Sequence, residues 1–298
     1  ARGLRTKNEA YFRGLMKDFK IRKSILTRKD CYSLEHGVDA DLKGRFTSLN
    51  RRNVSAFCKK LGVSENVFFL TAYNLSIGLF SNEKDTVSSS IHSGRTDSRW
   101  NRLAGPLFLT YFFRNKEGVD QTVPELLKTN ATQIMDTMRC YISNLHADEM
   151  FFQYQGDILN IDTVGGYPAE RQRMQLDSLP FHLQVFTDAK GYYYELRYWE
   201  NRFDTRQLHD FLTVMESLMD AMQEETLVRR LSRRLPDRLF PLHYTITVGE
   251  LNQAAKGQLV TGVDGKEPVK VYVFDENCRK KPFGAWGELY VMDCKPKQ

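Results

Sequence analysis

The segment that most constrains the fold is the run 67–80, which is the most apolar stretch of the chain. It is shorter than the ~20 residues that a membrane span needs, and polar residues interrupt it, so we expect it in a protein core. Ser64 can accept hydrogen bonds from the free amides of a first helical turn, and Gly62 is suited to end a preceding helix in a left-handed conformation. The sequence therefore predicts a helix over 65–80 that is buried on most sides.

Three further segments have the periodicity of core-facing helices. Apolar residues in 54–61 recur at i, i+3, i+4 and i+7, which is the spacing of one helical face. A capping-box pattern at 122–125 predicts the start of a helix that runs to about residue 145. A similar pattern at 204–207 precedes a continuous apolar stripe over 208–222, which favours a core helix over a cofactor-binding segment.

Strand patterns alternate with these helices. Residues 181–185 alternate apolar and polar side chains, 188–191 have a turn composition, and the aromatic-rich stretch 192–199 follows, which predicts a β-hairpin. Aromatic side chains fall on both faces of 192–199, so we expect both faces to be at least partly covered. Two more strands are expected over 86–93 and 107–113. Helices and strands mixed in this order favour the α/β class, with a mixed sheet that helices cover on at least one face.

Charge, cysteine spacing and the N-terminal residues limit the classes of protein that fit. The 298 residues carry a net charge of +6, which is too mild over this length to require a nucleic-acid partner. The first residues are basic and no apolar segment follows them, so we expect no secretory signal. The five cysteines are far apart and include no C-x-x-C pair, which favours a reducing, cytoplasmic setting.

The composition changes after Met222. An arginine-rich stretch at 227–238, followed by a segment without clear periodicity up to residue 257, is typical of connecting chain. From residue 265 short strands and turns follow, in a piece below the size that normally folds unaided. The predicted organisation is a lobe over 1–235, a linker over 236–256 and a small β-rich subdomain over 257–298.

Common catalytic and cofactor motifs do not occur in the sequence. There is no G-x-x-x-x-G-K-[ST] loop, G-x-G-x-x-G turn, H-E-x-x-H helix or G-x-S-x-G elbow, so nucleotide, metal and serine-hydrolase chemistry have no support, and we expect no bound cofactor. Two histidines could act as general bases because imidazole titrates near neutral pH. They are His92, and His146 with Asp148 close by. Local packing or a hydrogen bond is the commoner role of such isolated histidines.

Four stretches carry a resemblance to a known family. They are SSSIHSGR at 88–95, LAGPLFLTYFFR at 103–114, HADEMFF at 146–152, and LDSLPFHLQVF with ELRYWENRFD between 176 and 204. Through these stretches, in this order, residues 11–235 resemble the C-terminal lobe of a condensation domain from a nonribosomal peptide synthetase. The resemblance implies one half of a chloramphenicol-acetyltransferase-like fold.

The resemblance also implies a function. In this family two lobes face each other across a tunnel, and carrier proteins bring acyl and aminoacyl groups on phosphopantetheine arms from opposite ends. The amine attacks the thioester, and a His-His-x-x-x-Asp-Gly motif of the N-terminal lobe supplies a histidine. That motif has no match in this sequence. The resemblance therefore implies a carrier protein and a separate N-terminal lobe as partners, with the phosphopantetheine arm as substrate.

By the same resemblance, three residues would line the tunnel: Arg95, Gly105 and Leu109. Leu109 stands where the family usually carries asparagine, which would remove a polar contact with the substrate. Met150 likewise stands where a proline is usual.

The tail carries a second resemblance. The segment 268–291 is similar to the stretch of an adenylation domain that leads to its Gly-Glu-Leu motif, here Gly287, Glu288 and Leu289. The phosphate loop and the ribose-binding aspartate of that family have no counterpart, so adenylation by the tail is not expected. The alternative is that these strands only pack on the preceding lobe.

Three functions remain open from the sequence. The first is a lobe that shapes the tunnel for amide-bond formation in secondary metabolite biosynthesis and is not catalytic by itself. The second is a non-catalytic docking module for a carrier protein. The third is a stand-alone acyltransferase that uses His146 or His92. The acidic surface of a carrier protein could meet four arginines: Arg229, Arg230, Arg233 and Arg234.

Overall fold

The computed structural model of the protein describes residues 2–20, 25–26, 37–92, 105, 108–118, 120–140, 150–157, 163–164, 166–168, 179–224, 227–240, 244–247, 268–275, 280–282 and 285–291. The helices are α1 (Arg2–Leu15), α2 (Arg51–Leu61), α3 (Glu65–Ser81), α4 (Val123–Arg139), α5 (Thr205–Glu224) and the 3-10 helices η2 (Val228–Arg234) and η3 (Asp237–Leu239). The strands are β1 (Asp39–Arg45), β2 (Asp85–His92), β3 (Leu109–Lys116), β4 (Met150–Gly156), β5 (Thr163–Val164), β6 (Tyr167–Pro168), β7 (Phe181–Asp188), β8 (Gly191–Trp199), β9 (Tyr244–Thr247), β10 (Pro268–Phe274) and β11 (Glu288–Val291).

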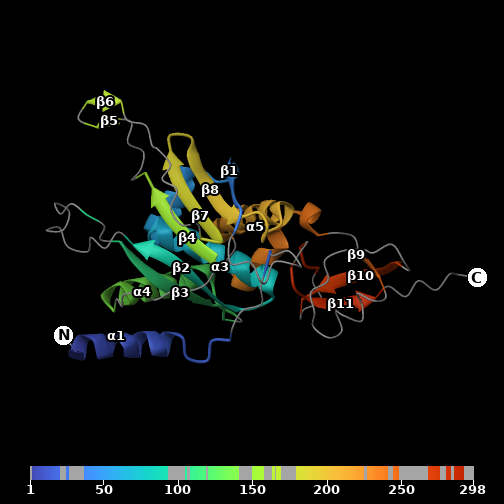
Figure 1. Cartoon of the computed structure of the whole chain (residues 1–298), viewed down its shortest axis with the longest axis horizontal. Coiled ribbons are helices and arrows are strands. Elements are labelled where there is room, and N and C mark those ends of the chain that lie inside the picture. The colour runs from blue at the N-terminus through green and yellow to red at the C-terminus, as the bar shows by residue number, and fades with distance from the viewer. Residues whose placement is uncertain are drawn as a thin grey trace, which may run out of the picture.

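Six of the strands form one mixed sheet in the order β1-β8-β7-β4-β2-β3. Strand β4 is parallel to both of its neighbours, β2 and β7, whereas the other pairs are antiparallel. The hairpin of β7 and β8 turns between Asp188 and Gly191, as the turn pattern predicts. Helices α3 and α5 pack together, and α3 contacts β2 and β4 (Figure 1). The predicted α/β architecture, a mixed sheet covered by helices, is therefore confirmed.

The caps of α2 and α3 form where the sequence predicts them. Gly62 ends α2 with a left-handed φ of 71°, which glycine adopts without a steric cost. Ser64 then begins α3, because its Oγ accepts a hydrogen bond from the N–H of Val67 at 3.3 Å. Asn82 ends α3, also in the left-handed region, with a φ of 58°. The bounds of α3 thus agree with the predicted helix to within one residue.

Helix α3 forms the centre of the core. The ring of Tyr73 packs against Phe152 of β4, Phe181 of β7 and Phe211 of α5, with centroid separations of 5.0, 6.3 and 5.8 Å. All four side chains are buried. Aromatic rings at such separations add to the free energy gained by removing their area from water. The helix therefore joins the sheet to α5 as the apolar composition of its sequence predicts.

The polar residues within α3 are buried and form hydrogen bonds to neighbouring elements. Asn74 Nδ2 donates to Ser88 Oγ of β2 at 2.8 Å. Asn130 Nδ2 of α4 donates both to Thr71 Oγ1 at 3.0 Å and to Asn115 Oδ1 of β3 at 2.9 Å. A buried polar group is costly without a partner, so these bonds fix how α3, α4 and the β2–β3 hairpin fit together.

Helices α4 and α1 cover the outer edge of β3. Gln133 of α4 pairs with the backbone of Arg114: its Oε1 accepts from the Arg114 N–H at 2.8 Å and its Nε2 donates to the Arg114 carbonyl at 2.7 Å. Helix α1 runs beside this edge (Figure 1), where the Tyr11 hydroxyl lies 2.9 Å from Thr137 Oγ1. The edge backbone at Arg114 is therefore not available for pairing with another strand.

The Arg114 guanidinium joins the β2–β3 hairpin to the end of α1. Its Nε and Nη2 donate to the two carboxylate oxygens of Asp85 at 2.7 and 2.5 Å. Its Nη1 donates to the carbonyls of Leu15 at 2.6 Å and Lys17 at 2.8 Å. The guanidinium also lies over the ring of Phe19, 5.5 Å from its centroid. A planar fork of donors suits this bidentate pairing, which an ammonium group could not reproduce.

A smaller sheet with the order β11-β10-β9 lies near the C-terminus (Figure 1). Strand β9 falls within the segment predicted to be a linker, and it pairs antiparallel with β10. A third strand is needed because an isolated pair of strands is at best marginally stable. The small sheet is attached to the lobe through Trp286, whose backbone N–H donates to the backbone carbonyl of Phe80 in α3 at 2.7 Å. Ala285 and Trp286 also pack against the main core.

A buried lysine lies where the small sheet meets the lobe. The side chain of Lys281 is 4% exposed, and its stem lies against Gly287, where a Cβ atom would come within 3.0 Å of the lysine Cγ. Burial lowers the pKa of Lys281 to about 8, against the opposing effect of the Asp275 and Glu117 carboxylates. Burial likewise raises the pKa of Glu117 to about 7, although Lys84 and Lys281 act in the opposite direction. The junction thus places groups of opposite charge in a poorly solvated environment.

The arginine-rich segment is packed on the lobe and does not form free connecting chain. The structure extends the main core beyond the predicted end of the lobe at residue 235, because Leu239 is 2% exposed and belongs to the core cluster. The apolar side chains that anchor the arginine-rich segment are Val228, Leu231, Leu235 and Leu239.

No helix among the described residues combines the length and apolarity needed to span a membrane.

Candidate functional site

The open end of the β2–β3 hairpin brings together two residues that the sequence analysis singled out. His92 of β2 lies directly opposite Leu109 of β3 in the ladder, and Ser90 lies opposite Tyr111. Alternate residues of a strand share a face, so these four side chains lie on one face of the hairpin. Tyr111 belongs to the core cluster beneath α3, which identifies this face as the one toward α3.

The electrostatics of this end are set by burial. Burial lowers the pKa of His92, so its imidazole is neutral at pH 7 and could accept a proton. Burial raises the pKa of the Tyr111 hydroxyl. The phenol therefore stays protonated. The site therefore offers neutral hydrogen-bonding groups beside an apolar leucine. None of the four side chains on this face carries a positive charge that could stabilise a developing oxyanion.

The remaining predicted site residues of this region fall mostly outside the described part. Gly105 is described and has a φ of 131°, a conformation that favours glycine. Arg95, His146 and Asp148 lie outside the described residues. The helix that begins at Val123 ends at Arg139, with Cys140 as its C-cap, so it is about six residues shorter than the predicted helix to residue 145. Met150 begins β4 and is 2% exposed, so it belongs to the core.

The four predicted docking arginines lie on the surface of η2. All four are exposed. Arg229 is paired with Asp120 at 3.2 Å, and Arg234 lies 3.8 Å from Glu224. Two of the four charges are therefore partly balanced within the chain, and the docking role of this cluster stays a prediction.

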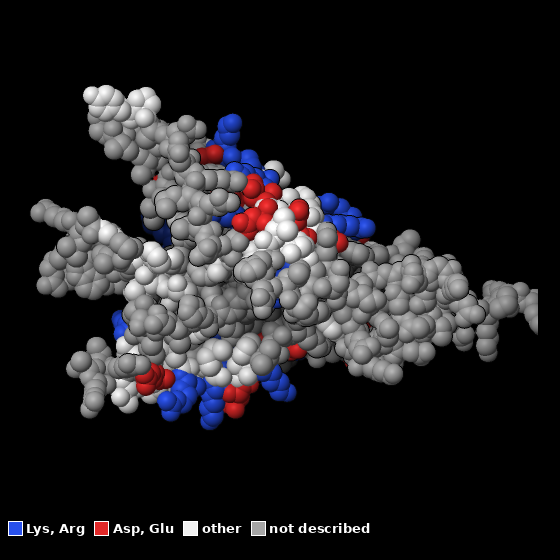
Figure 2. All heavy atoms as spheres, in the orientation of Figure 1, with Lys and Arg blue, Asp and Glu red and all other residues white. Residues whose placement is uncertain are grey.

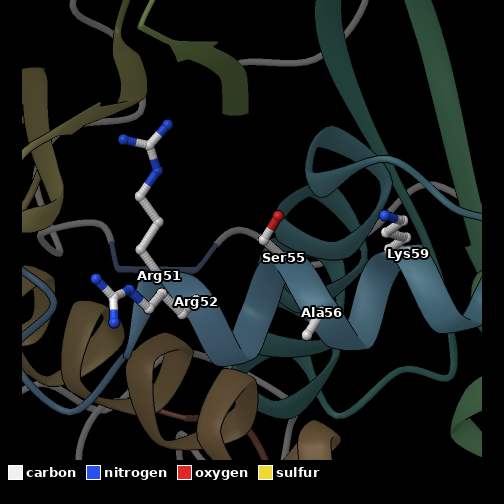
Figure 3. Close-up of a pocket in the computed structure, with 5 residues that line it drawn as sticks. All are labelled: Arg51, Arg52, Ser55, Ala56 and Lys59. Atoms are coloured by element: carbon white, nitrogen blue, oxygen red, sulfur yellow. The ribbon is translucent and has the colours of Figure 1, made fainter.

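A second basic surface lies on α2, and the sequence analysis did not identify it. A shallow hollow of about 410 Å³ is lined by Arg51, Arg52, Ser55, Ala56 and Lys59. Figure 3 shows Arg51, Ser55 and Lys59 projecting on one side of the helix. The signal in the sequence is weak because the two basic pairs are separated by six residues and come together only on a helical surface.

A hydrogen-bonded cluster lies beneath this surface, at the start of α3. The Glu65 carboxylate accepts hydrogen bonds from the hydroxyls of Tyr192, at 3.0 Å, and Tyr154. Burial and the Glu65 charge raise the pKa of both tyrosines, so both stay protonated donors. Burial also raises the pKa of the nearby Cys58 thiol to about 12, which makes it unreactive at neutral pH. The cluster holds α3 to β4 and β8 and has no nucleophile.

Charge on the face seen in Figure 2 is mixed: basic and acidic side chains are interspersed along its upper and lower edges. Within the described ranges, no three His, Cys, Asp or Glu side chains are close enough to hold a metal ion. Three candidate sites lie in the described part of the chain: the end of the β2–β3 hairpin, the basic surface of η2 and the basic surface of α2.

Comparisons with known proteins identify the fold. No family model matches the sequence, and no curated protein matches it. The structure is similar to the cyclization-docking bidomain of a nonribosomal peptide synthetase from Sorangium cellulosum, with 13% identity and a TM-score of 0.59 over 76% of this chain and 50% of that one. It is also similar to the condensation domain of the Monacolin K polyketide synthase, with 14% identity and a TM-score of 0.59 over 76% of this chain and 59% of that one.

A third similar structure is a four-domain nonribosomal peptide synthetase bound to AMP and glycine. The identity is 14% and the TM-score 0.61, over 77% of this chain and 19% of that one. The chain thus spans about half the length of the single- and two-domain structures it matches. At these identities the likeness establishes a condensation-domain-like fold and carries no residue roles.

Proposed function

We propose that the chain forms the C-terminal lobe of a condensation-type domain of a nonribosomal peptide synthetase. In this role it shapes one wall of the tunnel in which a carrier-bound amine attacks a carrier-bound thioester, and it is not catalytic by itself. The observation that carries the proposal is the likeness in fold to cyclization and condensation domains over about three quarters of this chain.

The chemistry of the β2–β3 end supports a wall more than a catalytic centre. His92 is neutral, and the residue directly across the ladder from it is Leu109, which adds an apolar side chain to the same face. A general base is most effective when its pKa lies near the working pH. Burial moves the pKa of His92 away from that range.

The proposed reaction needs two further components. An N-terminal lobe would complete the tunnel and supply the proton-handling histidine. Carrier proteins would present the reactants on phosphopantetheine arms: the amine nitrogen bonds to the thioester carbonyl carbon, the carbon–sulfur bond breaks, and the thiolate leaves and takes up the proton that the amine loses. Holding both reactants on tethers raises their effective concentration, which supplies much of the rate.

The tail would then be an adenylation-like remnant joined to this lobe, and no adenylation is proposed for it. In its Gly287-Glu288-Leu289 motif, Gly287 directly precedes β11, and Glu288 and Leu289 are the first two residues of the strand. Gly287 is required there on steric grounds, because a Cβ atom would lie 2.5 Å from the carbonyl oxygen of Phe274.

The proposal is tested with the purified chain and two carrier domains, one loaded with an acyl group and one with an aminoacyl group. We expect isothermal titration to detect binding of at least one loaded carrier. Intact-protein mass spectrometry of the carriers should detect no transfer of the acyl group. His92→Ala should leave both results unchanged, because the imidazole has no catalytic part in this lobe.

Two results would contradict the proposal. The absence of binding by every loaded carrier would remove the role as a condensation lobe. Acyl transfer by the chain alone, lost in His92→Ala or His146→Ala while the fold persists by circular dichroism, would identify a stand-alone acyltransferase instead.

A further inference from the structure

Helix α2 concentrates positive charge on an exposed face. It carries Arg51, Arg52, Lys59 and Lys60 and no carboxylate, and all four cations are exposed. The arginines occupy the first turn and the lysines the last. Eight residues at 1.5 Å per residue separate the two pairs by about 12 Å along the helix axis.

Most of this charge has no counter-charge among the described residues. Arg51 is the exception: it lies 3.8 Å from the carboxylate of Asp157 and donates to the carbonyl of Asp188 at 3.3 Å. Within the described part of the chain, no ion pair involves Arg52, Lys59 or Lys60. The surface of η2 differs, because Asp120 and Glu224 partly balance its arginines.

The shape of the surface favours a macromolecular partner. The residues that line the hollow all come from one helix, so a small molecule would keep most of its surface in water. The backbone amides of Arg52 and Asn53 are also occupied, because Asn50 Oδ1 accepts from both at 2.9 and 3.2 Å. Contacts to a partner must therefore come from the side chains, whose directions Figure 3 shows.

Two features favour an acidic protein over a nucleic acid. No aromatic side chain lines the hollow, so it has no surface on which bases could stack. At the Arg51 end, Asp157 partly balances Arg51 and Asp188 is paired with Arg45, so unbalanced positive charge does not continue past the start of the helix, as a phosphate backbone would require. A protein helix with carboxylates two turns apart would match Arg52 and the lysine pair without extending past Arg51.

We propose that the exposed face of α2 is a docking surface for an acidic helix of a partner protein. This inference rests on the proposed function, within which the partner is a carrier protein. The pairing would be exposed to solvent, so it would act mainly on the rate and orientation of association and would weaken with salt.

The test compares two double charge reversals. One variant is Arg52→Glu with Lys59→Glu on α2, and the matched control is Arg233→Glu with Arg234→Glu on η2. Each lowers the net charge by the same amount, from +6 to +2. Titration with a phosphopantetheinylated carrier domain at low salt should find roughly tenfold weaker binding for the α2 variant, about 1.4 kcal/mol, and less than about threefold for the η2 variant. The difference should shrink at high salt.

Each other outcome overturns the inference. Equal losses in both variants would identify a long-range effect of net charge, and a loss in the η2 variant alone would place the carrier on η2. Binding of a single-stranded oligonucleotide that is lost only in the α2 variant would identify a nucleic-acid surface. An unchanged α2 variant beside a binding native chain removes this inference alone, whereas no binding by the native chain removes the proposed function as well.

Discussion

Arg114 belongs to a strand, yet its side chain connects three separate parts of the molecule. It binds the Asp85 carboxylate with two donors and reaches the carbonyls of Leu15 and Lys17 at the end of α1. The side chain is 8% exposed, so little water could replace these partners. Removing one member of a buried charged pair leaves the other without compensation.

We expect Arg114→Lys to lower the free energy of unfolding by about 2 kcal/mol, because a lysine keeps the charge but loses the planar fork. Urea unfolding measures this loss. Hydrogen exchange should show that the substitution increases the amide exchange rate more in α1 than in α5. Lys116→Ala, at the exposed end of the same strand, should change stability by less than about 0.5 kcal/mol. Equal stability of Arg114→Lys and the native protein would show that the geometry of the fork is unimportant.

Single residues with local roles could be predicted from the sequence, whereas those with distant partners could not. Ser64 and Gly62 act on amides and backbone angles within a few residues, so the pattern around them is sufficient. Arg114 depends on carbonyls that lie about 100 positions earlier in the chain. The surface of α2 was missed for a similar reason: Arg52 and Lys59 are ordinary charged residues until a helix places them on one exposed surface.

At the level of elements, Asn130 joins α4 to α3 and β3 through a single amide. Its Nδ2 donates to Thr71 and Asn115, and all three side chains are buried. We expect Asn130→Leu to destabilise the protein by about 2 kcal/mol in urea unfolding, because two acceptors lose their donor in an environment without water.

The matched control for this change lies on the same helix. Met135 of α4 is 52% exposed, so Met135→Gln should alter stability by less than about 0.5 kcal/mol. If Asn130→Leu proves neutral or stabilising, the added apolar volume outweighs the lost hydrogen bonds, and the network does not fix the position of α4.

The elements differ in how well their sequences predict them. The hairpin of β7 and β8 has alternation over 181–185, an aromatic-rich second strand and a four-residue turn pattern between them, and the structure confirms the hairpin. Strand β1 has the sequence DADLKGR, whose charges and glycine do not favour a strand, and it forms because β8 offers a complete antiparallel partner. The position of β4 between β2 and β7 depends on parallel pairing over long distances, which no local pattern contains.

For the molecule as a whole, the junction between the lobe and the small sheet should respond to pH. Burial raises the pKa of Glu117 to about 7 from its ordinary 4.5. Between these values the folded protein holds a proton that the unfolded chain has lost. The stability that this group contributes is therefore fully present below pH 4.5 and is lost as the pH rises through 7.

We expect Glu117→Gln to remove this dependence. Relative to the native protein, the variant should gain up to about 3 kcal/mol of stability between about pH 5 and pH 8, measured by urea unfolding at each pH. Glu83→Gln, an exposed change near the same junction, should leave the native pH dependence intact. A Glu117→Gln profile parallel to that of the native protein would mean that the carboxyl is well solvated in the folded state.

The hydrogen bond from Trp286 to the carbonyl of Phe80 also bears on how the chain is made. The two residues are more than 200 positions apart. A ribosome adding roughly 5–20 residues per second would need about 10 to 40 s to pass from one to the other. Throughout that interval the central helix exists without the segment around Trp286 that lies against its final turn. We therefore expect chaperones that shield apolar surface to bind the nascent chain until this segment has been synthesised.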